Sequence, residues 1–167
     1  MTLSPERAGS EEAAKQAALR ILARGPRTER EVEGRLRERG YQEGAVERAL
    51  ERLRRVSLLD DRAFVRSFLR TELFKAAQGR RLLELKLRRR GVPDALIREL
   101  DAFLEDDPDL AGRSLASEQG RAEVGLSQLR RRYARLRPDV YKRRMEQALA
   151  RRGFGWDTIR DLLGEES

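Results

Sequence analysis

Cysteine and histidine are both absent from the 167-residue sequence. Their absence excludes disulfide bonds, thiolate and imidazole metal ligands, and every mechanism that needs a histidine base or a cysteine nucleophile. The sequence also lacks the motifs G-x-x-x-x-G-K-[ST], G-x-G-x-x-G and G-x-S-x-G, which mark phosphate-binding loops and nucleophile turns. We therefore expect a protein that is not an enzyme and that binds no metal and no cofactor.

Long apolar runs are absent as well, since charge-free apolar stretches such as residues 56–59 extend over only a few residues. Such runs are too short to cross a bilayer. The N-terminal residues MTLSPERAGSEEAAK lack the basic segment followed by an apolar one that marks a secretory signal. We therefore expect a cytoplasmic protein with no membrane contact, acting as a monomer.

Aromatic residues make up only 5% of the chain, whereas charged residues make up 40% and hydrophobic residues 39%. Charged chains rich in leucine, alanine, arginine and glutamate are typical of helical proteins. The acidic run at residues 105–109 lacks the glycine and the distal glutamate of a calcium loop, so we interpret it as a solvated linker.

Three similar stretches recur along the chain, and they align on Gly40, Gly91 and Gly153. Apolar residues occupy the positions eight and four before each glycine and one, six and nine after it. Steps of four place apolar residues on one face of a helix. Internal repetition of this kind indicates tandem structural units. The five columns are Val32/Leu83/Met145, Leu36/Leu87/Leu149, Tyr41/Val92/Phe154, Val46/Ile97/Ile159 and Ala49/Leu100/Leu162.

Each glycine has the surroundings of a helix C-terminus. Arginine in the last turn complements the negative end of the helix dipole, and glycine adopts the left-handed conformation that closes the helix. In this motif the residue after the glycine contacts the third residue before the cap, which pairs Leu36 with Tyr41, for example. We call the segment from the leucine four residues before each glycine to the residue after it the helix stop of its repeat. The three helix stops are Leu36–Tyr41, Leu87–Val92 and Leu149–Phe154.

Helical periodicity continues on both sides of each stop, so the pattern predicts three helices per repeat. Start signals agree, because Thr28 and Glu31 form a capping box and Asp60-Asp61 can cap a helix at Arg62. The predicted class is all-α, with repeats at 11–56, 57–105 and 106–164, the last preceded by an extended helical arm. The remaining predicted helices are 13–24, 44–55, 62–74, 93–105, 124–136 and 156–163.

Positive charge concentrates in the C-terminal third, since residues 111–167 hold 13 Lys and Arg against 8 Asp and Glu. Clusters of this density favour phosphates or an acidic protein groove, although a solvated arginine-rich surface is the alternative for any single residue. The candidate partner- or DNA-binding residues are Lys86, Arg88, Arg89, Arg130, Arg131, Arg132, Arg135, Lys142, Arg143, Arg144 and Arg151.

Comparison of aligned positions in the three repeats separates structural arginines from candidate functional ones. The position before the glycine is arginine in all three repeats, which fits a structural role at a helix end. Two residues before the glycine the repeats have Glu38, Arg89 and Arg151, whose side chains should point away from the apolar face of the helix. Because glutamate serves there in the first repeat, stability does not require arginine. Arg89 and Arg151 are therefore better functional candidates than Arg90.

These columns and the phrases around them resemble the RecX family of regulatory proteins. The resemblance covers residues 13–163. Its most specific parts are LLDD-x-x-F at Leu58–Phe64 and the frame G-x-x-x-L-x-x-x-L-x-x-x-G at Gly79–Gly91. The sequence departs from the family pattern by the extra Gly25 before Pro26 and by the weakly matching chain before the third repeat. The matching stretches are ALRILARGPRTEREVEGRL, LLDDRAFVRSFL, GRRLLELKLRRRGV and ALARRGFGWDTI.

The resemblance implies a curved, elongated row of three tandem three-helix repeats. It also implies binding to filaments of the RecA recombinase on DNA, with inhibition of their ATPase and strand exchange, and hence a role in recombination, DNA repair and the SOS response. Two alternatives remain open: a sequence-neutral DNA-binding repeat protein of another pathway, and a helical scaffold for an unrelated acidic protein. Few aromatic residues are available for stacking on single strands, with Tyr133 and Tyr141 the nearest candidates.

Overall fold

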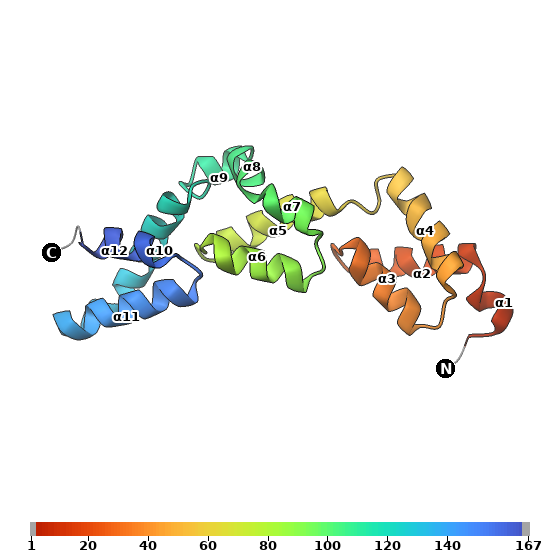
Figure 1. Cartoon of the computed structure of the whole chain (residues 1–167), viewed down its shortest axis with the longest axis horizontal. Coiled ribbons are helices and arrows are strands. Elements are labelled where there is room, and N and C mark those ends of the chain that lie inside the picture. The colour runs from red at the N-terminus through yellow and green to blue at the C-terminus, as the bar shows by residue number, and fades with distance from the viewer. Residues whose placement is uncertain (1–2, 165–167) are drawn as a thin grey trace. The chain divides into compact units, whose positions relative to one another are not determined.

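The computed structural model describes residues 3–164, except for the side chain of Asp139. Within these residues the chain is all-helical and contains no strand (Figure 1). The helices are α1 (Pro5–Ala8), α2 (Glu11–Leu22), α3 (Glu29–Glu38), α4 (Glu43–Arg55), α5 (Asp61–Lys75), α6 (Arg80–Arg89), α7 (Asp94–Arg98), α8 (Leu100–Glu105), α9 (Pro108–Ala111), α10 (Glu118–Tyr133), α11 (Pro138–Arg151) and α12 (Trp156–Gly164).

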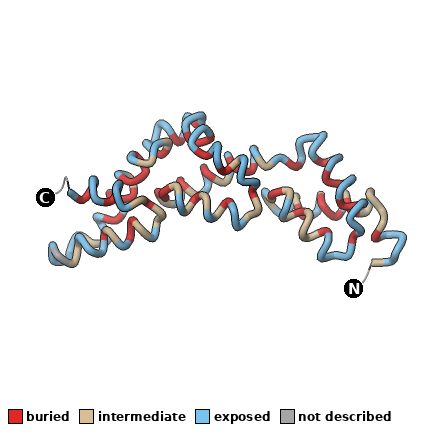
Figure 2. The backbone as a smooth tube through the Cα atoms, viewed as in Figure 1, coloured by how far each residue is buried: buried red, intermediate tan, exposed pale blue. Residues whose placement is uncertain are grey.

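The chain divides into two compact units. The first comprises Met1–Val65 with Arg88–Pro93, and the second comprises Arg66–Leu87 with Asp94–Ser167. The division cuts through α5 and α6, so the last residues of α6 belong with the first unit. Buried residues follow one face of each longer helix, as amphipathic periodicity requires (Figure 2).

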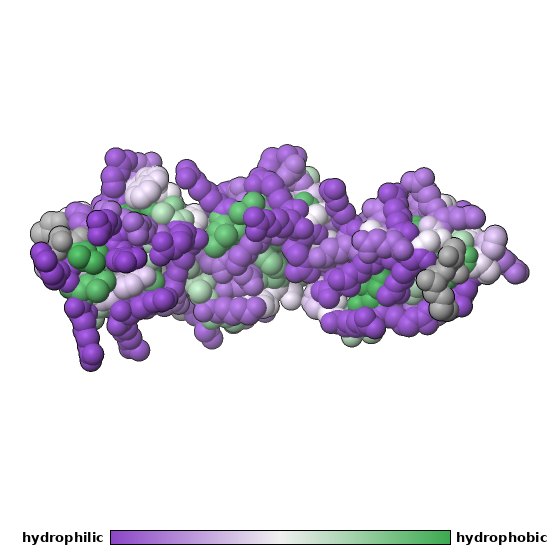
Figure 3. All heavy atoms as spheres, turned by 90° about the horizontal axis from the view of Figure 1, so that it is seen from below, coloured by the Kyte–Doolittle hydropathy of each residue, from purple (hydrophilic) through white to green (hydrophobic). Residues whose placement is uncertain are grey.

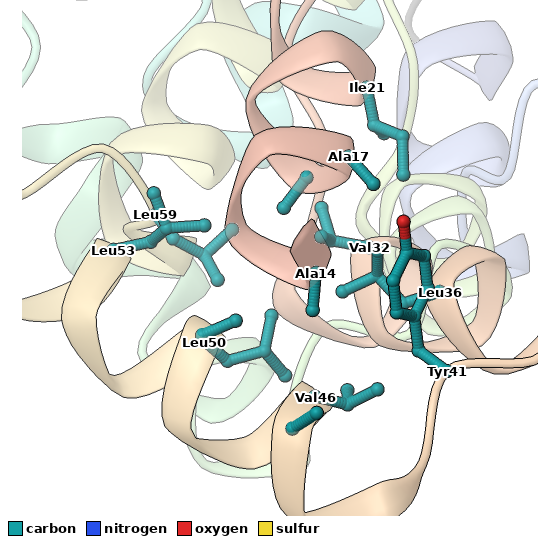
Figure 4. Close-up of a cluster of buried hydrophobic side chains, with 13 residues drawn as sticks. Ala14, Ala17, Ile21, Val32, Leu36, Tyr41, Val46, Leu50, Leu53 and Leu59 are labelled. Carbon is teal, nitrogen blue, oxygen red and sulfur yellow. The ribbon is translucent and has the colours of Figure 1, made fainter. Parts of the chain in front are cut away.

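The core of the first unit lies among α2, α3 and α4. Figure 4 shows apolar side chains from these three helices converging on one another. The contribution of α2 consists largely of alanines, which allow α4 to approach its backbone closely. The labelled residues of this cluster are Ala14, Ala17, Ile21, Val32, Leu36, Tyr41, Val46, Leu50, Leu53 and Leu59.

The second unit contains a corresponding cluster among α10, α11 and α12, with Met145 and Leu149 fully buried at its centre. Every residue of the five aligned columns is buried, in all three repeats. The apolar helix faces that these columns predict are therefore the buried faces. The sequence displays them directly because helical periodicity is a local property.

All three helix stops have the predicted backbone. Gly40, Gly91 and Gly153 have φ angles of 86°, 76° and 84°, in the left-handed region that favours glycine. The amide of Tyr41 donates to the carbonyl oxygen of Leu36 at 3.2 Å, and the amide of Phe154 donates to that of Leu149 at 3.3 Å. These are the bonds that close a Schellman motif.

Several boundaries differ from the predicted ones. The helix α10 begins six residues earlier than predicted, because the hydroxyl of Ser117 caps it by accepting from the amide of Gly120 at 3.0 Å. One predicted helix at 93–105 is instead α7 and α8, which are separated at Glu99. Asp60 caps α5 as predicted and accepts from the amides of Arg62 and Ala63. Asp61 instead accepts from the amide of Glu29 at 2.9 Å.

The chain before the third repeat, where we predicted an extended helical arm, contains the four-residue α9 and a loop to Ser117. Buried Arg121 anchors this loop by donating to the carbonyl oxygens of Leu115 and Ala116 at 3.0 and 2.7 Å. The interpretation of residues 105–109 as a solvated linker is wrong for Asp107, which is 6% exposed and caps α9. None of the helices between residues 3 and 164 combines the length and apolarity needed to cross a membrane.

Candidate interaction surfaces

The helix stop of the second repeat is docked inside the first unit. The hydroxyl of Thr28, at the start of α3, donates to the carbonyl oxygen of Arg90 at 2.6 Å. The guanidinium of Arg90 donates to both carboxylate oxygens of Glu31 and lies 4.9 Å from the ring centre of Phe64. Burial acts to raise the pKa of Glu31, but the hydrogen bonds from Arg90 and Thr28 outweigh it, so this pKa is lowered. Arg90 therefore serves the fold.

The helix stop of the third repeat is docked in a comparable way inside the second unit. The amide of Gly79, just before α6, donates to the carbonyl oxygen of Arg152 at 2.8 Å. The guanidinium of Arg152 donates to the side-chain oxygen of Gln128 at 2.8 Å, and burial lowers the pKa of Arg152. The arginine before the glycine is thus occupied within the fold in both repeats, as its structural interpretation requires.

The stop of the first repeat is open by comparison. A Cβ atom added to Gly40 would meet no atom within 4 Å, whereas one on Gly91 would lie 2.6 Å from the Arg30 side chain. One on Gly153 would lie 2.5 Å from Leu82. Nearby, the amide of Gln42 donates to the carbonyl oxygen of Ala8 at 2.8 Å, so α1 covers the chain just beyond this stop.

Among the candidates on α6, Lys86 has partners within the fold. Its ammonium donates to the carboxylate of Glu72 and, at 2.7 Å, to the side-chain oxygen of Gln78. The bond from Lys86 lowers the pKa of Glu72. Arg88 and Arg89 are exposed. The structure thus places Lys86 in an internal polar network and leaves Arg89 on the surface.

The third repeat carries the remaining candidates, and all of them are exposed. All but Arg151 follow the C-terminal turns of α10, the turn after it and the first turns of α11, two helices that pack against each other. Arg151 is the last residue of α11. Among the side chains that the structure describes, no carboxylate pairs with Arg131, Lys142 or Arg143. Hydrophilic side chains cover most of the face in Figure 3, including these helices at its left. The exposed candidates of this repeat are Arg130, Arg131, Arg132, Arg135, Lys142, Arg143, Arg144 and Arg151.

Such a surface can attract phosphates or carboxylates. Unpaired guanidinium groups form charge-assisted hydrogen bonds with either anion. The acidic run offers no competing metal site, because Asp107 accepts from the amides of Asp109 and Leu110 and pairs with Arg70. In the described part of the chain no cluster of three or more carboxylates is arranged to hold a metal ion.

Two exposed apolar residues, Leu85 and Trp156, were not selected from the sequence. Their exposures are 42% and 55%, which is high for large apolar side chains. The aligned columns contain a signal that could have identified them. Three residues after the glycine the repeats have Glu43, Asp94 and Trp156, so tryptophan replaces an acidic residue at the start of a helix.

Tandem three-helix units, joined through docked helix stops and exposing unpaired arginines, define a helical repeat protein. Comparison with known families narrows this class. Residues 14–53 match the first three-helix domain of RecX, residues 60–100 the second and residues 122–163 the third. The chain belongs to the RecX family.

Curated relatives support this membership over nearly the whole chain. A regulatory protein RecX from Mycobacterium sp. (strain JLS) is 36% identical over 160 residues, covering 93% of this chain and 82% of its own. The regulatory protein RecX of Chlorobaculum tepidum is 32% identical over 163 residues, covering 95% and 94%. These homologues are named as regulators.

Solved structures show the same fold. The crystal structure of RecX from Lactobacillus salivarius aligns with a TM-score of 0.74 at 23% identity, covering 93% of this chain and 95% of that one. A second crystal structure of regulatory protein RecX aligns with a TM-score of 0.71 at 24% identity, covering 93% and 73%. At these identities the likeness concerns the fold alone.

Proposed function

We propose that this protein binds filaments of the RecA recombinase on DNA and inhibits their ATPase and strand-exchange activities. Family membership over nearly the whole chain supports a regulatory role. The observation that carries the proposal is the concentration of exposed arginines, together with Lys142, on α10 and α11, where Arg131, Lys142 and Arg143 have no carboxylate partner among the described side chains. A nucleoprotein filament offers anions of both kinds, phosphates and carboxylates.

Binding of this kind requires no catalytic group in the regulator. Arginines that contact phosphates release condensed counterions, so such contacts weaken as salt rises. They also steer association over distances of about a Debye length. We expect the protein to act as a monomer in the cytoplasm, with the candidates on α10 and α11 supplying most of the electrostatic attraction and Arg88 and Arg89 adding to it.

The test is the DNA-dependent ATPase and strand exchange of RecA with the protein added at substoichiometric and equal amounts. We expect both activities to fall as the protein is added. If neither activity responds at any ratio, the proposal is wrong.

A variant with Arg131, Lys142 and Arg143 changed to glutamate should lose most of this inhibition. The matched control changes three exposed arginines of the first unit, Arg7, Arg20 and Arg24, to glutamate, so the net charge falls by the same amount. Inhibition by the control should equal that of the unaltered protein. Equal loss in both proteins would show that total charge, rather than the surface of α10 and α11, is responsible.

The alternative is a sequence-neutral DNA-binding protein of another pathway, which the density of arginines in the third repeat also favours. The two proposals differ in whether RecA strengthens the binding of the protein to DNA. Salt-sensitive binding to DNA that is equally strong with and without RecA would favour the alternative. Binding that is tighter to the filament than to either component supports the proposed function.

A further inference from the structure

The second unit has a groove that combines exposed apolar side chains with unpaired arginines. Its volume is about 260 Å³, smaller than the roughly 300–1,000 Å³ of small-molecule pockets. It therefore suits one or two side chains of a partner better than a cofactor. The α6 helix supplies one wall, and the end of α11 with the start of α12 supplies the other. The residues that matter here are Arg81, Leu82, Leu85, Arg151, Phe154 and Trp156.

The repeats show that folding does not require the apolar residues of this groove. Six residues before the glycine the chain has Gly34, Leu85 and Gln147, and three after it Glu43, Asp94 and Trp156. An acidic residue in the first turn complements the helix dipole, so tryptophan is the less favourable choice for stability there. Leu85 and Trp156 nonetheless stay 42% and 55% exposed. Two such departures meet in one groove, which indicates a binding role.

Two arginines make the groove favour a negatively charged partner. Arg81 and Arg151 are exposed, and no carboxylate in the part of the chain that the structure describes pairs with either. Tryptophan and arginine are also the residues most enriched where binding energy concentrates in protein interfaces. An occupant that matches both features presents an apolar side chain flanked by carboxylates.

We propose that this groove anchors the protein component of the RecA filament, by receiving an apolar side chain beside Trp156 and Leu85 while Arg81 and Arg151 pair with flanking carboxylates. The inference rests on the proposed function and adds the site of contact. Protein is favoured over nucleic acid because stacking sites for single strands use successive exposed aromatic rings. Among the residues that line this groove, Trp156 is the only exposed aromatic one, since Phe154 is 3% exposed.

The experiment measures the affinity of each variant for RecA filaments assembled on single-stranded DNA. Trp156→Ala and Leu85→Ala should each weaken binding by about tenfold, as expected for residues at the centre of an interface. The matched control is Leu58→Ala, which truncates a leucine that is 56% exposed in the first unit and should bind within about twofold of the unaltered protein. Because all three side chains are exposed, circular dichroism should show unchanged melting.

Two outcomes separate failure of this inference from failure of the proposed function. If the unaltered protein binds the filament and both groove variants bind equally well, the groove is not the anchor, although the proposed function stands. If the unaltered protein does not bind at all, both fail.

A third outcome would assign the groove to nucleic acid. Trp156 is the only tryptophan, so its fluorescence reports on the groove when single-stranded DNA alone is titrated into the protein. We expect no change beyond dilution. Quenching by DNA alone, together with a matching loss of DNA affinity in Trp156→Ala, would overturn the proposal in favour of base stacking.

Discussion

The hydroxyl of Thr28 donates a hydrogen bond to the carbonyl oxygen of Arg90 at 2.6 Å, across 62 residues of sequence. The hydroxyl oxygen of Thr28 in turn accepts from the amide of Glu31 at 3.2 Å and so caps the start of α3. One buried hydroxyl therefore begins one helix and holds the end of another. Carbonyl groups at a helix end have no partner within the helix, and docking provides one.

Replacing Thr28 with valine should lower the free energy of unfolding by about 2 kcal/mol. Loss of an N-cap costs about 1 kcal/mol, and a shielded carbonyl left without a donor costs about 1 kcal/mol more. Thr28→Ser keeps the hydroxyl and should lose less than half as much. Urea unfolding followed by circular dichroism measures both. Equal stability of the two variants would contradict the dual role of this hydroxyl.

The contact between Gly79 and Gly153 predicts a second effect on stability. A Cβ atom on Gly79 would lie 2.3 Å from the carbonyl oxygen of Gly153, and this backbone atom cannot move without shifting the helix stop. Gly79→Ala should therefore destabilise the protein by about 1–3 kcal/mol. Gly34→Ala is the control with the opposite sign, because it lies inside α3 with no atom within 4 Å of the added methyl. It should stabilise by about 0.5–1 kcal/mol. Thermal melting that fell for both variants would refute the steric explanation.

Local features of the fold could be predicted from the sequence. The buried columns and the left-handed glycines depend on residues within about ten positions of one another, so helical periodicity and backbone sterics determine them. The docking of Arg90 on Thr28 and Glu31 could not be predicted, because nothing local relates residues so far apart. The buried Asp107 was misinterpreted for the same reason, since its partner Arg70 belongs to another helix.

For the candidate site residues too, local features could be predicted from the sequence and contacts between distant residues could not. Exposure of Arg89 and Arg151 followed from comparison of aligned positions, which is information that the sequence contains. The pairing of Lys86 with Glu72 depends on how α5 and α6 pack, and periodicity does not reveal it. Trp156 was missed because the candidates were selected by charge, although tryptophan at a position that is acidic in the other two repeats is a signal the sequence contains.

Acid should destabilise the protein partly through Asp107. Its hydrogen bond from Arg70 lowers the pKa of Asp107, and amides of α9 add to this effect. A carboxyl group whose pKa is lower in the folded state stabilises that state fully above its unfolded pKa of about 3.9. This contribution is lost as the pH falls through the folded pKa.

The variant Asp107→Asn tests this effect, because asparagine keeps the helix cap but cannot become charged. It should be less stable than the unaltered protein at pH 7, and the two should converge as the pH falls well below 3.9. Denaturant unfolding across this range measures the difference. A difference that stays constant with pH would mean that the charge of Asp107 contributes nothing.

The neighbouring arginines of the second helix stop allow a role in partner binding to be distinguished from a role in stabilising the fold. Arg89 is exposed, whereas Arg90 pairs with Glu31 and lies over Phe64. Arg89→Glu should weaken filament binding roughly three- to tenfold at low salt and leave melting unchanged, as should Arg151→Glu in the third repeat. Arg90→Glu places a carboxylate beside Glu31 and should lower the free energy of unfolding by about 2 kcal/mol. Affinity and urea unfolding measured on the same three variants separate the roles. If Arg89→Glu and Arg151→Glu destabilise the protein without affecting binding, both arginines are structural.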